Sequence, residues 1–212
     1  MRQCIDSLGN NIYLALRKNE CMITADQKIY SVNEYFELEA NSPEKLAFDN
    51  GIITTVAGGS IIHNELIVNL LYTLKAIALS KKETYKVYGI DIKIRIESGN
   101  CFVYPDAVVV CSKPLLYQQR NDVITNPLLI IEVISPTTEV HDLTKKLADY
   151  KRIPSLMEYV MVKQDVPELM QYAGKSQNDD WQYNEVTGLD AHLFLHSMQA
   201  ELPLAQIYQG IL

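Results

Sequence analysis

The sequence predicts an α/β fold in which a mixed β-sheet is flanked by helices, with additional hairpins near its N-terminal and C-terminal ends. A long apolar segment at 61–80 has the length of a helix rather than a strand. Short runs rich in β-branched residues at 101–111, 128–135 and 159–162 have the length of strands. A helix is predicted between the last two runs. Because a strand, a helix and a strand in succession imply a right-handed crossover, those two strands should lie parallel and adjacent.

The regions on either side of this core predict two hairpins. Asn50-Gly51 lies within alternating apolar residues at 46–56, which is the pattern of a hairpin turn. Ser31 and Glu34 have the spacing of a capping box, so a short helix should begin there and precede this hairpin. Polar residues separate two short strand patterns between 170 and 183, and this pattern predicts the C-terminal hairpin.

Length, charge and cysteine spacing limit the class of protein. With 212 residues, of which 48% are hydrophobic, the chain can bury a substantial core. We expect an N-terminal extension at 1–27 and a single domain at 28–212. Since the net charge is −7, any contact with nucleic acid needs a local basic patch.

The four cysteines and the hydropathy pattern predict a cytoplasmic location. None of the cysteines has the C-x-x-C spacing of a zinc site, so we expect free thiols in a reducing compartment. No apolar run reaches the roughly 20 residues of a membrane span, and the N-terminus lacks the apolar core of a signal peptide. We therefore expect no membrane partner.

His63 lies in the first turn of the helix predicted at 61–80. Apolar residues surround much of this helix, so it should be well buried against a sheet. A histidine at this position is more often a polar residue at a helix start than a catalytic group. The N-terminal end of a helix also suits an anionic ligand, and we regard His63 as an accessory group for a nearby site.

The segment at 89–96 alternates isoleucines with polar residues. Asp91, Lys93 and Arg95 therefore share one face of a predicted strand. The simplest interpretation is a half-exposed strand with a solvated face. The second interpretation makes Asp91 an accessory group of a site and makes the two basic residues phosphate contacts.

Pro105 and Asp106 lie within the next predicted strand. A turn at 97–100 predicts that this strand pairs antiparallel with the segment at 89–96, which brings the polar face of that segment towards Asp106. Proline cannot donate a hydrogen bond to a ladder, so Pro105 marks an edge or an irregularity. Asp106 should therefore be presented where regular pairing is disturbed.

Asp106 and Glu132 each interrupt a run of apolar residues. Burying a carboxylate without a partner is costly, so such residues usually serve a purpose. Glu132 is the only charge on one face of its predicted strand. Asp142 and Lys146 in the following helix are spaced i, i+4 and share a face.

Two strand carboxylates and a helix lysine at one edge of a sheet fit a divalent-metal phosphodiesterase site. Asp106 and Glu132 can hold Mg²⁺ or Mn²⁺, which lowers the pKa of a bound water and stabilises charge in the transition state. Lys146 would orient the attacking water or neutralise a phosphate oxygen. The alternative from the same spacing is a buried Glu132–Lys146 salt bridge without catalysis.

The residues of this central region resemble the bacterial restriction-endonuclease family usually called Uma, of the PD-(D/E)xK nuclease superfamily. The resemblance extends from about Tyr30 to near the C-terminus. It is carried by Tyr104-Pro105-Asp106, the segment 127–135, Thr138, Asp142, Lys146, Tyr150 and Glu158-Tyr159. It implies a restriction-endonuclease-like mixed sheet flanked by helices, often assembled as a homodimer.

The resemblance also implies roles for individual residues. Asp106 and Glu132 become the metal ligands, with the main-chain carbonyl of Val133 as a third. The superfamily lysine would fall at Ile134, and Lys146 from the following helix would take its place, with Asp142 as an accessory group. The family pattern also has a glutamate shortly before the Asn-Gly turn, where this chain has Ala47. Glu44 and Glu65 are candidates to replace it.

The sequence therefore predicts a Mg²⁺- or Mn²⁺-dependent DNA endonuclease that hydrolyses phosphodiester bonds. The expected phosphate contacts are Lys93, Arg95, Lys145 and Arg152. The rival hypothesis is a catalytically degenerate nuclease fold that acts as a nucleic-acid-binding or protein-interaction module. Carboxylates that converge on a cavity would favour the enzyme, and a closed ion pair between Glu132 and Lys146 would favour the module. RNA as substrate is equally compatible, since no residue is a recognisable reader of the 2′-hydroxyl.

Overall fold

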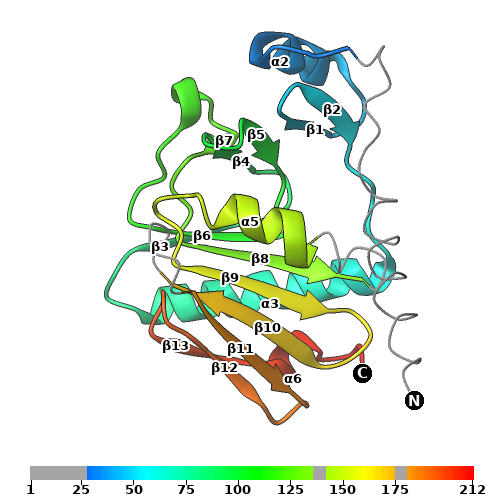
Figure 1. Cartoon of the computed structure of the whole chain (residues 1–212). Helices are drawn as coiled ribbons and strands as arrows, with labels where there is room; N and C mark the ends of the chain where they lie inside the picture. The colour runs from blue at the N-terminus through cyan, green and yellow to red at the C-terminus, as the bar shows by residue number, and fades with distance from the viewer. Residues whose placement is uncertain (1–27, 136–141, 175–180) are drawn as a thin grey trace, which may run out of the picture.

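The computed structural model describes residues 28–135, 142–174 and 181–212, and its largest element is a six-stranded mixed sheet (Figure 1). The spatial order of its strands is β11 (Gln182–Thr187), β10 (Glu168–Ala173), β9 (Glu158–Lys163), β8 (Leu129–Ile134), β6 (Ala107–Cys111) and β3 (Tyr85–Tyr88). β8 and β9 run parallel, whereas the other neighbouring strands are antiparallel. This confirms the predicted mixed sheet and its parallel crossover.

A smaller five-stranded sheet lies above the main sheet in Figure 1. Its strands follow the order β2 (Ile52–Thr55), β1 (Leu46–Asp49), β5 (Cys101–Val103), β4 (Lys93–Ile96) and β7 (Val123–Ile124). A separate ladder joins β12 (His192–Leu195) to β13 (Ala200–Pro203). Neither this ladder nor β3 was predicted, because each of these strands has only four residues and weak alternation.

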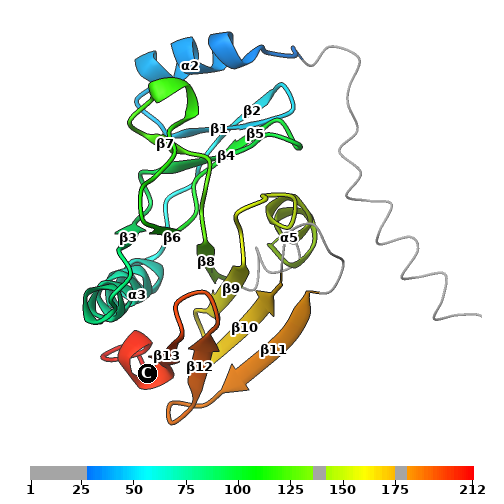
Figure 2. The same cartoon turned by 90° about the vertical axis from the view of Figure 1, so that its left-hand side faces the viewer.

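Helices cover both faces of the main sheet and one side of the smaller sheet. The described helices are α2 (Val32–Asn41), α3 (Ile61–Ser80), the 3₁₀-helix η2 (Tyr117–Gln119), the π-helix η3 (Asp142–Lys146), α5 (Leu147–Tyr150) and α6 (Leu204–Ile207). α3 lies on one face of the main sheet, and η3 with α5 lies on the opposite face (Figure 2). Among the described residues, no helix is both long and apolar enough to cross a membrane.

The capping box and the N-terminal hairpin form as predicted. The Ser31 hydroxyl accepts from the Glu34 amide, and the Glu34 carboxylate accepts from the Ser31 amide. In the hairpin, Asp49 pairs with Ile52, so Asn50 and Gly51 form a two-residue turn. Their φ angles of 47° and 94° are the left-handed values that such a turn requires and that asparagine and glycine tolerate. The C-terminal hairpin is also present, with Tyr172 opposite Tyr183 in the ladder between β10 and β11.

β8 is the most buried strand of the main sheet, with all six residues buried. Its side chains alternate between two cores, as a period of two requires. Leu129, Ile131 and Val133 belong to the core beneath α3. Ile130 and Ile134 belong to the core beneath α5. This second core also contains residues of β4 and β5, so the two sheets share buried residues.

The strand predicted at 101–111 is broken into β5 and β6, which belong to different sheets. β5 pairs with β1 and β4, whereas β6 pairs with β3 and β8. In the ladder between β6 and β8, Ala107 lies opposite Ile131, so the same register would place Pro105 opposite Val133. Because proline has no N–H to donate, the ladder ends there and the chain crosses between the sheets. The irregularity predicted at Pro105 is therefore the crossing point.

Two expectations about side-chain exposure were wrong. The helix at 61–80 is buried on one face only, and its opposite face exposes Ile61, Val68, Tyr72 and Leu79. The segment at 89–96 is a strand only from Lys93, because the chain turns at Gly89–Ile92. Lys93 itself is buried rather than solvated.

Candidate active site

Asp106 occupies the point where the chain enters the main sheet, directly before β6. Its Oδ2 atom accepts a hydrogen bond of 2.7 Å from the main-chain N–H of Val133. This N–H lies where the ladder between β6 and β8 has ended, so the carboxylate replaces the missing backbone partner. Because Val133 directly follows Glu132, the same contact holds the Asp106 carboxylate against the main chain of β8, one residue from Glu132, at one end of the main sheet.

Glu132 lies on the face of β8 that η3 and α5 cover, and only 5% of its side chain is exposed. Its Oε1 atom accepts a hydrogen bond of 2.6 Å from the Tyr150 hydroxyl and lies 3.2 Å from Lys146 Nζ. The lysine and the tyrosine are four residues apart and therefore share one side of the helical segment. Removing one partner of a buried ion pair costs about 3–5 kcal/mol, so this contact helps hold the helix on the sheet.

His63 reaches Asp106 from the opposite face of the main sheet. Its Nε2 atom lies 3.4 Å from Asp106 Oδ1, and its Nδ1 atom lies 3.3 Å from Gln164 Nε2. Ser60, the N-cap of α3, accepts from the His63 amide and donates to Gln164 Oε1. The imidazole is thus held in place by groups from α3 and from the end of β9.

The pKa of His63 is raised above its ordinary value. The main cause is the hydrogen bond with Asp106, and the negative charges of Asp106 and Glu132 act in the same direction. Partial burial and the positive charge of Lys146 oppose this effect. The protonated imidazole is therefore favoured next to the carboxylates.

A cavity of about 210 Å³ lies next to the Glu132 contacts. Lys146 and Tyr150 line it from the helical side, and Ala47 lines it from β1. A longer side chain at position 47 would therefore extend into the space beside the groups that hold Glu132. Ala47 is the position at which the sequence resemblance implies a glutamate.

The donor atoms near this sheet end are of the type that a hard divalent cation prefers. Asp106 and Glu132 supply carboxylate oxygens, which are the ligand type that such a cation prefers. In the described part of the chain, no group of three or more histidine, cysteine, aspartate or glutamate side chains is arranged to hold a metal ion. The two carboxylates fit a Mg²⁺ or Mn²⁺ ion in chemistry, with fewer ligands than a complete cage.

Asp91 and Lys93 do not join this group of residues. Asp91 is exposed and pairs with Lys45 at 2.6 Å. Lys93 Nζ lies 2.6 Å from Glu39 and 2.5 Å from Asp122, with 4% of the side chain exposed. The prediction that Lys93 contacts phosphate is therefore corrected, since its ammonium is buried and already neutralised by carboxylates.

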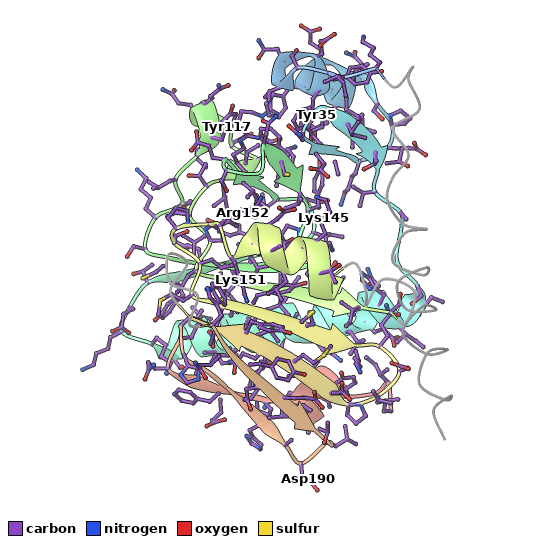
Figure 3. All side chains as sticks on the ribbon, viewed as in Figure 1. Tyr35, Tyr117, Lys145, Lys151, Arg152 and Asp190 are labelled. Carbon is purple, nitrogen blue, oxygen red and sulfur yellow. The ribbon has the colours of Figure 1, made fainter. Side chains whose placement is uncertain are left out.

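The remaining predicted basic residues lie around the smaller sheet and α5. Lys145 pairs with Asp49 at 2.7 Å and with Asp149 at 3.0 Å, and Arg152 lies 3.4 Å from Asp149. Lys145 and Arg152 lie between α5 and the smaller sheet (Figure 3). Arg95 lies over the rings of Phe102 in β5 and Tyr117 in η2, and it donates to Asn100.

The geometry leaves two predicted positions untested, and it contains two contacts that the sequence did not predict. Thr138 lies outside the described residues, and Asp142 begins η3 with its side chain likewise undescribed. The contact of Tyr150 with Glu132 was missed, although its i+4 spacing from Lys146 could have indicated it. Gln164 was missed because no local pattern indicates that it bonds to His63.

The raised pKa of His63 predicts that its contribution to stability depends on pH. Because the folded pKa lies above the ordinary value of 6.5, the contribution is fully present below pH 6.5 and is lost as the pH rises through the folded pKa. In metal-free buffer, the difference in urea midpoint between wild type and His63→Gln should be larger at pH 5.5 than at pH 9. In an Asp106→Asn background this pH dependence should shrink. A difference in urea midpoint between wild type and His63→Gln that is equal at both pH values would contradict the assignment.

Comparison with known proteins agrees with the geometry. A family model, Uma2, described as "Putative restriction endonuclease", matches residues 32–205. The uncharacterized Synechocystis sp. protein sll1609 is 30% identical over 172 residues, covering 81% of this chain and 96% of the relative. A second Synechocystis sp. protein, slr1290, is 30% identical over 181 residues, covering 85% of this chain and 92% of the relative.

A solved structure shares the fold. It is a crystal structure from Anabaena variabilis, described as that of "a putative nuclease belonging to DUF820". It matches with a TM-score of 0.64 and 15% sequence identity, over 82% of this chain and 96% of that chain. The fold match, the family match and the carboxylate pattern agree, and the chain belongs to the Uma2 family of "Putative restriction endonuclease" proteins.

Proposed function

We propose that this protein is a Mg²⁺- or Mn²⁺-dependent endonuclease that hydrolyses phosphodiester bonds in DNA. One observation carries the proposal: Asp106 and Glu132 lie at the same end of the main sheet, and Lys146 contacts Glu132 at 3.2 Å. Membership of a family described as restriction endonucleases supports a nuclease in general terms. DNA is accordingly the proposed substrate.

Each residue of the site has a proposed part. Asp106 and Glu132 would hold the cation, together with the main-chain carbonyl of Val133. When bound, such an ion lowers the pKa of a coordinated water and stabilises negative charge on the phosphate. Lys146 would present a positive charge to the water or to a phosphate oxygen. Tyr150 would orient Glu132 through its hydrogen bond.

His63 and Asp142 are proposed as accessory groups. His63 would fix the orientation of the Asp106 carboxylate, since the two side chains are in contact and the imidazole is held from its other side by Gln164. Asp142 is retained on the resemblance alone.

A second function is favoured by two specific observations. The ion pair between Lys146 and Glu132 is already closed, and Ala47 supplies no carboxylate to the neighbouring cavity. A site of this kind is stable without a cation. The rival proposal is therefore a degenerate nuclease fold that binds nucleic acid or protein without cutting.

The proposed path for the DNA backbone follows the side of α5 that faces the smaller sheet. A groove of about 610 Å³ in this region is lined by Arg95, Arg152 and Tyr117, and also by the exposed carboxylate of Glu97. Arg152 keeps 55% of its side chain exposed, so its guanidinium can reach a phosphate. Together with Lys145, these arginines are the proposed phosphate contacts, and Lys145 and Arg152 would exchange the carboxylates of Asp49 and Asp149 for phosphate oxygens.

Calorimetric titration with Mn²⁺ and nicking of supercoiled plasmid at low salt test the two functions. We expect wild type to bind Mn²⁺ and Asp106→Ala to bind none. Lys146→Ala should keep Mn²⁺ binding but lose activity by a factor of about 10²–10³, because it removes a charge that acts on the reacting groups. Lys82→Ala, which changes an exposed lysine after α3, is the matched control.

The possible outcomes separate the two proposals. Plasmid left intact by wild type with either metal would refute the endonuclease. Mn²⁺ binding that survives in Asp106→Ala would refute the ligand assignment. Wild type that neither binds Mn²⁺ nor cuts, but still binds DNA, would establish the degenerate module.

Ala47→Glu should strengthen Mn²⁺ binding by about tenfold, since a third carboxylate would enter the cavity beside the Glu132 contacts. The metal-free variant should unfold at lower urea than wild type, because added negative charge is not compensated there. Calorimetry and urea denaturation measure the two effects. Ala47→Gln has the same length without the charge, and equal behaviour of the two variants would contradict an electrostatic origin.

Arg152→Gln should reduce the salt dependence of DNA binding. If Arg152 contacts one phosphate, the slope of log K against log salt concentration should become less steep by about 1. Fluorescence anisotropy with a labelled duplex measures this slope in a Lys146→Ala background, which prevents cleavage. Lys82→Gln removes the same charge elsewhere and should leave the slope unchanged, whereas an unchanged slope for Arg152→Gln would exclude the contact.

A further inference from the structure

α3 carries an exposed stripe of residues that the site does not use. We call it the α3 stripe, and it consists of Ile61, Glu65, Val68, Tyr72, Lys75 and Leu79. Its four large apolar side chains are strongly exposed, in chain order by 80%, 58%, 76% and 76%. Isolated apolar side chains on a surface need no explanation, but these four lie along one side of a single helix.

The spacing of the α3 stripe is that of a helix-pairing seam. Successive members are separated by four, three, four, three and four residues, as positions along one face of a coiled coil are. At 100° per residue they remain within a narrow arc of the helix surface. The stripe runs for about 27 Å along the helix at 1.5 Å per residue. It is therefore long enough to pair with another helix over five turns.

The order of residues along the α3 stripe is self-complementary when the helix is reversed. Read forwards it is apolar, acidic, apolar, apolar, basic, apolar, and read backwards the acidic and basic positions exchange places. A two-fold axis at the level of position 70 along the helix would bring Ile61 opposite Leu79 of the second copy. The same axis would bring Val68 opposite Tyr72.

The two charged members of the stripe fit this arrangement. Glu65 and Lys75 lie at equal distances on either side of position 70, so a reversed second copy would place each opposite the other. Both side chains are exposed, and within the described part of the chain neither forms a salt bridge. Two ion pairs would therefore form across the axis, flanking an apolar centre.

From these observations we propose that the α3 stripe is a self-association surface, on which the stripes of two copies pack antiparallel about a two-fold axis. A symmetric contact of this kind uses the same patch on both subunits and closes on itself. The partner is a second copy of this chain because the charge order of the stripe complements its own reversal. The inference rests on the surface of α3 and not on the proposed nuclease activity.

The arrangement determines where the two candidate sites would lie. His63 is near the first turn of α3, and in an antiparallel pair the equivalent residue of the second copy lies near the other end. At 1.5 Å per residue, the two histidines would be about 21 Å apart along the helix axis. Each candidate site would remain outside the contact between the helices and accessible to its own DNA strand.

The oligomeric state of the full chain tests the proposal, measured by sedimentation equilibrium. Wild type should be a dimer, and Val68→Asp should be a monomer, because a charge enters the apolar centre. Glu65→Lys should weaken the dimer at least tenfold, since it places like charges opposite each other. The double variant Glu65→Lys with Lys75→Glu should restore the dimer, because the two charges have exchanged places.

The control variants distinguish this contact from a general effect of net charge and from a parallel pairing of the helices. Glu44→Lys makes the same change in net charge away from α3 and should leave the dimer intact. In a parallel pair, Glu65 would lie opposite Glu65 of the second copy, and Glu65→Lys would only replace one like-charged pair by another. An effect of Glu65→Lys that the double variant reverses therefore identifies the antiparallel contact. A monomeric wild type, a dimer that survives Val68→Asp, or a double variant that stays dissociated would overturn the proposal.

The outcome is independent of the nuclease test. If wild type dimerises through α3 but cuts no DNA, the proposed function fails and the interface stands. If wild type cuts DNA as a monomer, the interface fails and the proposed function stands.

Discussion

The buried charge of Glu132 is the constraint on which the arrangement of the site depends. A carboxylate on the covered face of a fully buried strand must be compensated, and the compensating groups, Lys146 and Tyr150, come from the helical segment that follows. Their contacts hold η3 and α5 against the main sheet. The smaller sheet packs on the same core, so the helical segment that compensates Glu132 lies where the two sheets share buried residues.

The second constraint is the loss of a backbone donor at Pro105. The ladder between β6 and β8 does not continue through this proline, and beyond its end the N–H of Val133 needs an acceptor other than a ladder carbonyl. Asp106 supplies that acceptor with its side chain. One residue therefore closes the sheet and is held in the position that a ligand of a metal ion would need, beside Glu132. The structural and proposed chemical roles of Asp106 have the same geometric cause.

These features explain what could be predicted from the sequence. Period two places Glu132 on one face of its strand, and the i, i+4 spacing directs Lys146 to its helix face, so both followed from local pattern. The exposed side of α3 did not, because apolar residues all around a helix do not reveal which face a sheet will cover. Lys93 was misread for a related reason. Its partners Glu39 and Asp122 are far away in the sequence, so only the fold brings the ion pairs together.

The site also shows why stability and metal binding need not require the same residues. Two carboxylates with a lysine and a histidine of raised pKa leave little net charge at the sheet end. Such a group is compensated whether or not a cation is bound. Under the proposed function, a glutamate at position 47 would add a carboxylate to the cavity that Ala47 lines. Ala47 would then lower the affinity for a cation while leaving the metal-free cavity without an added charge, so this position would separate a metal-dependent nuclease from a binding module.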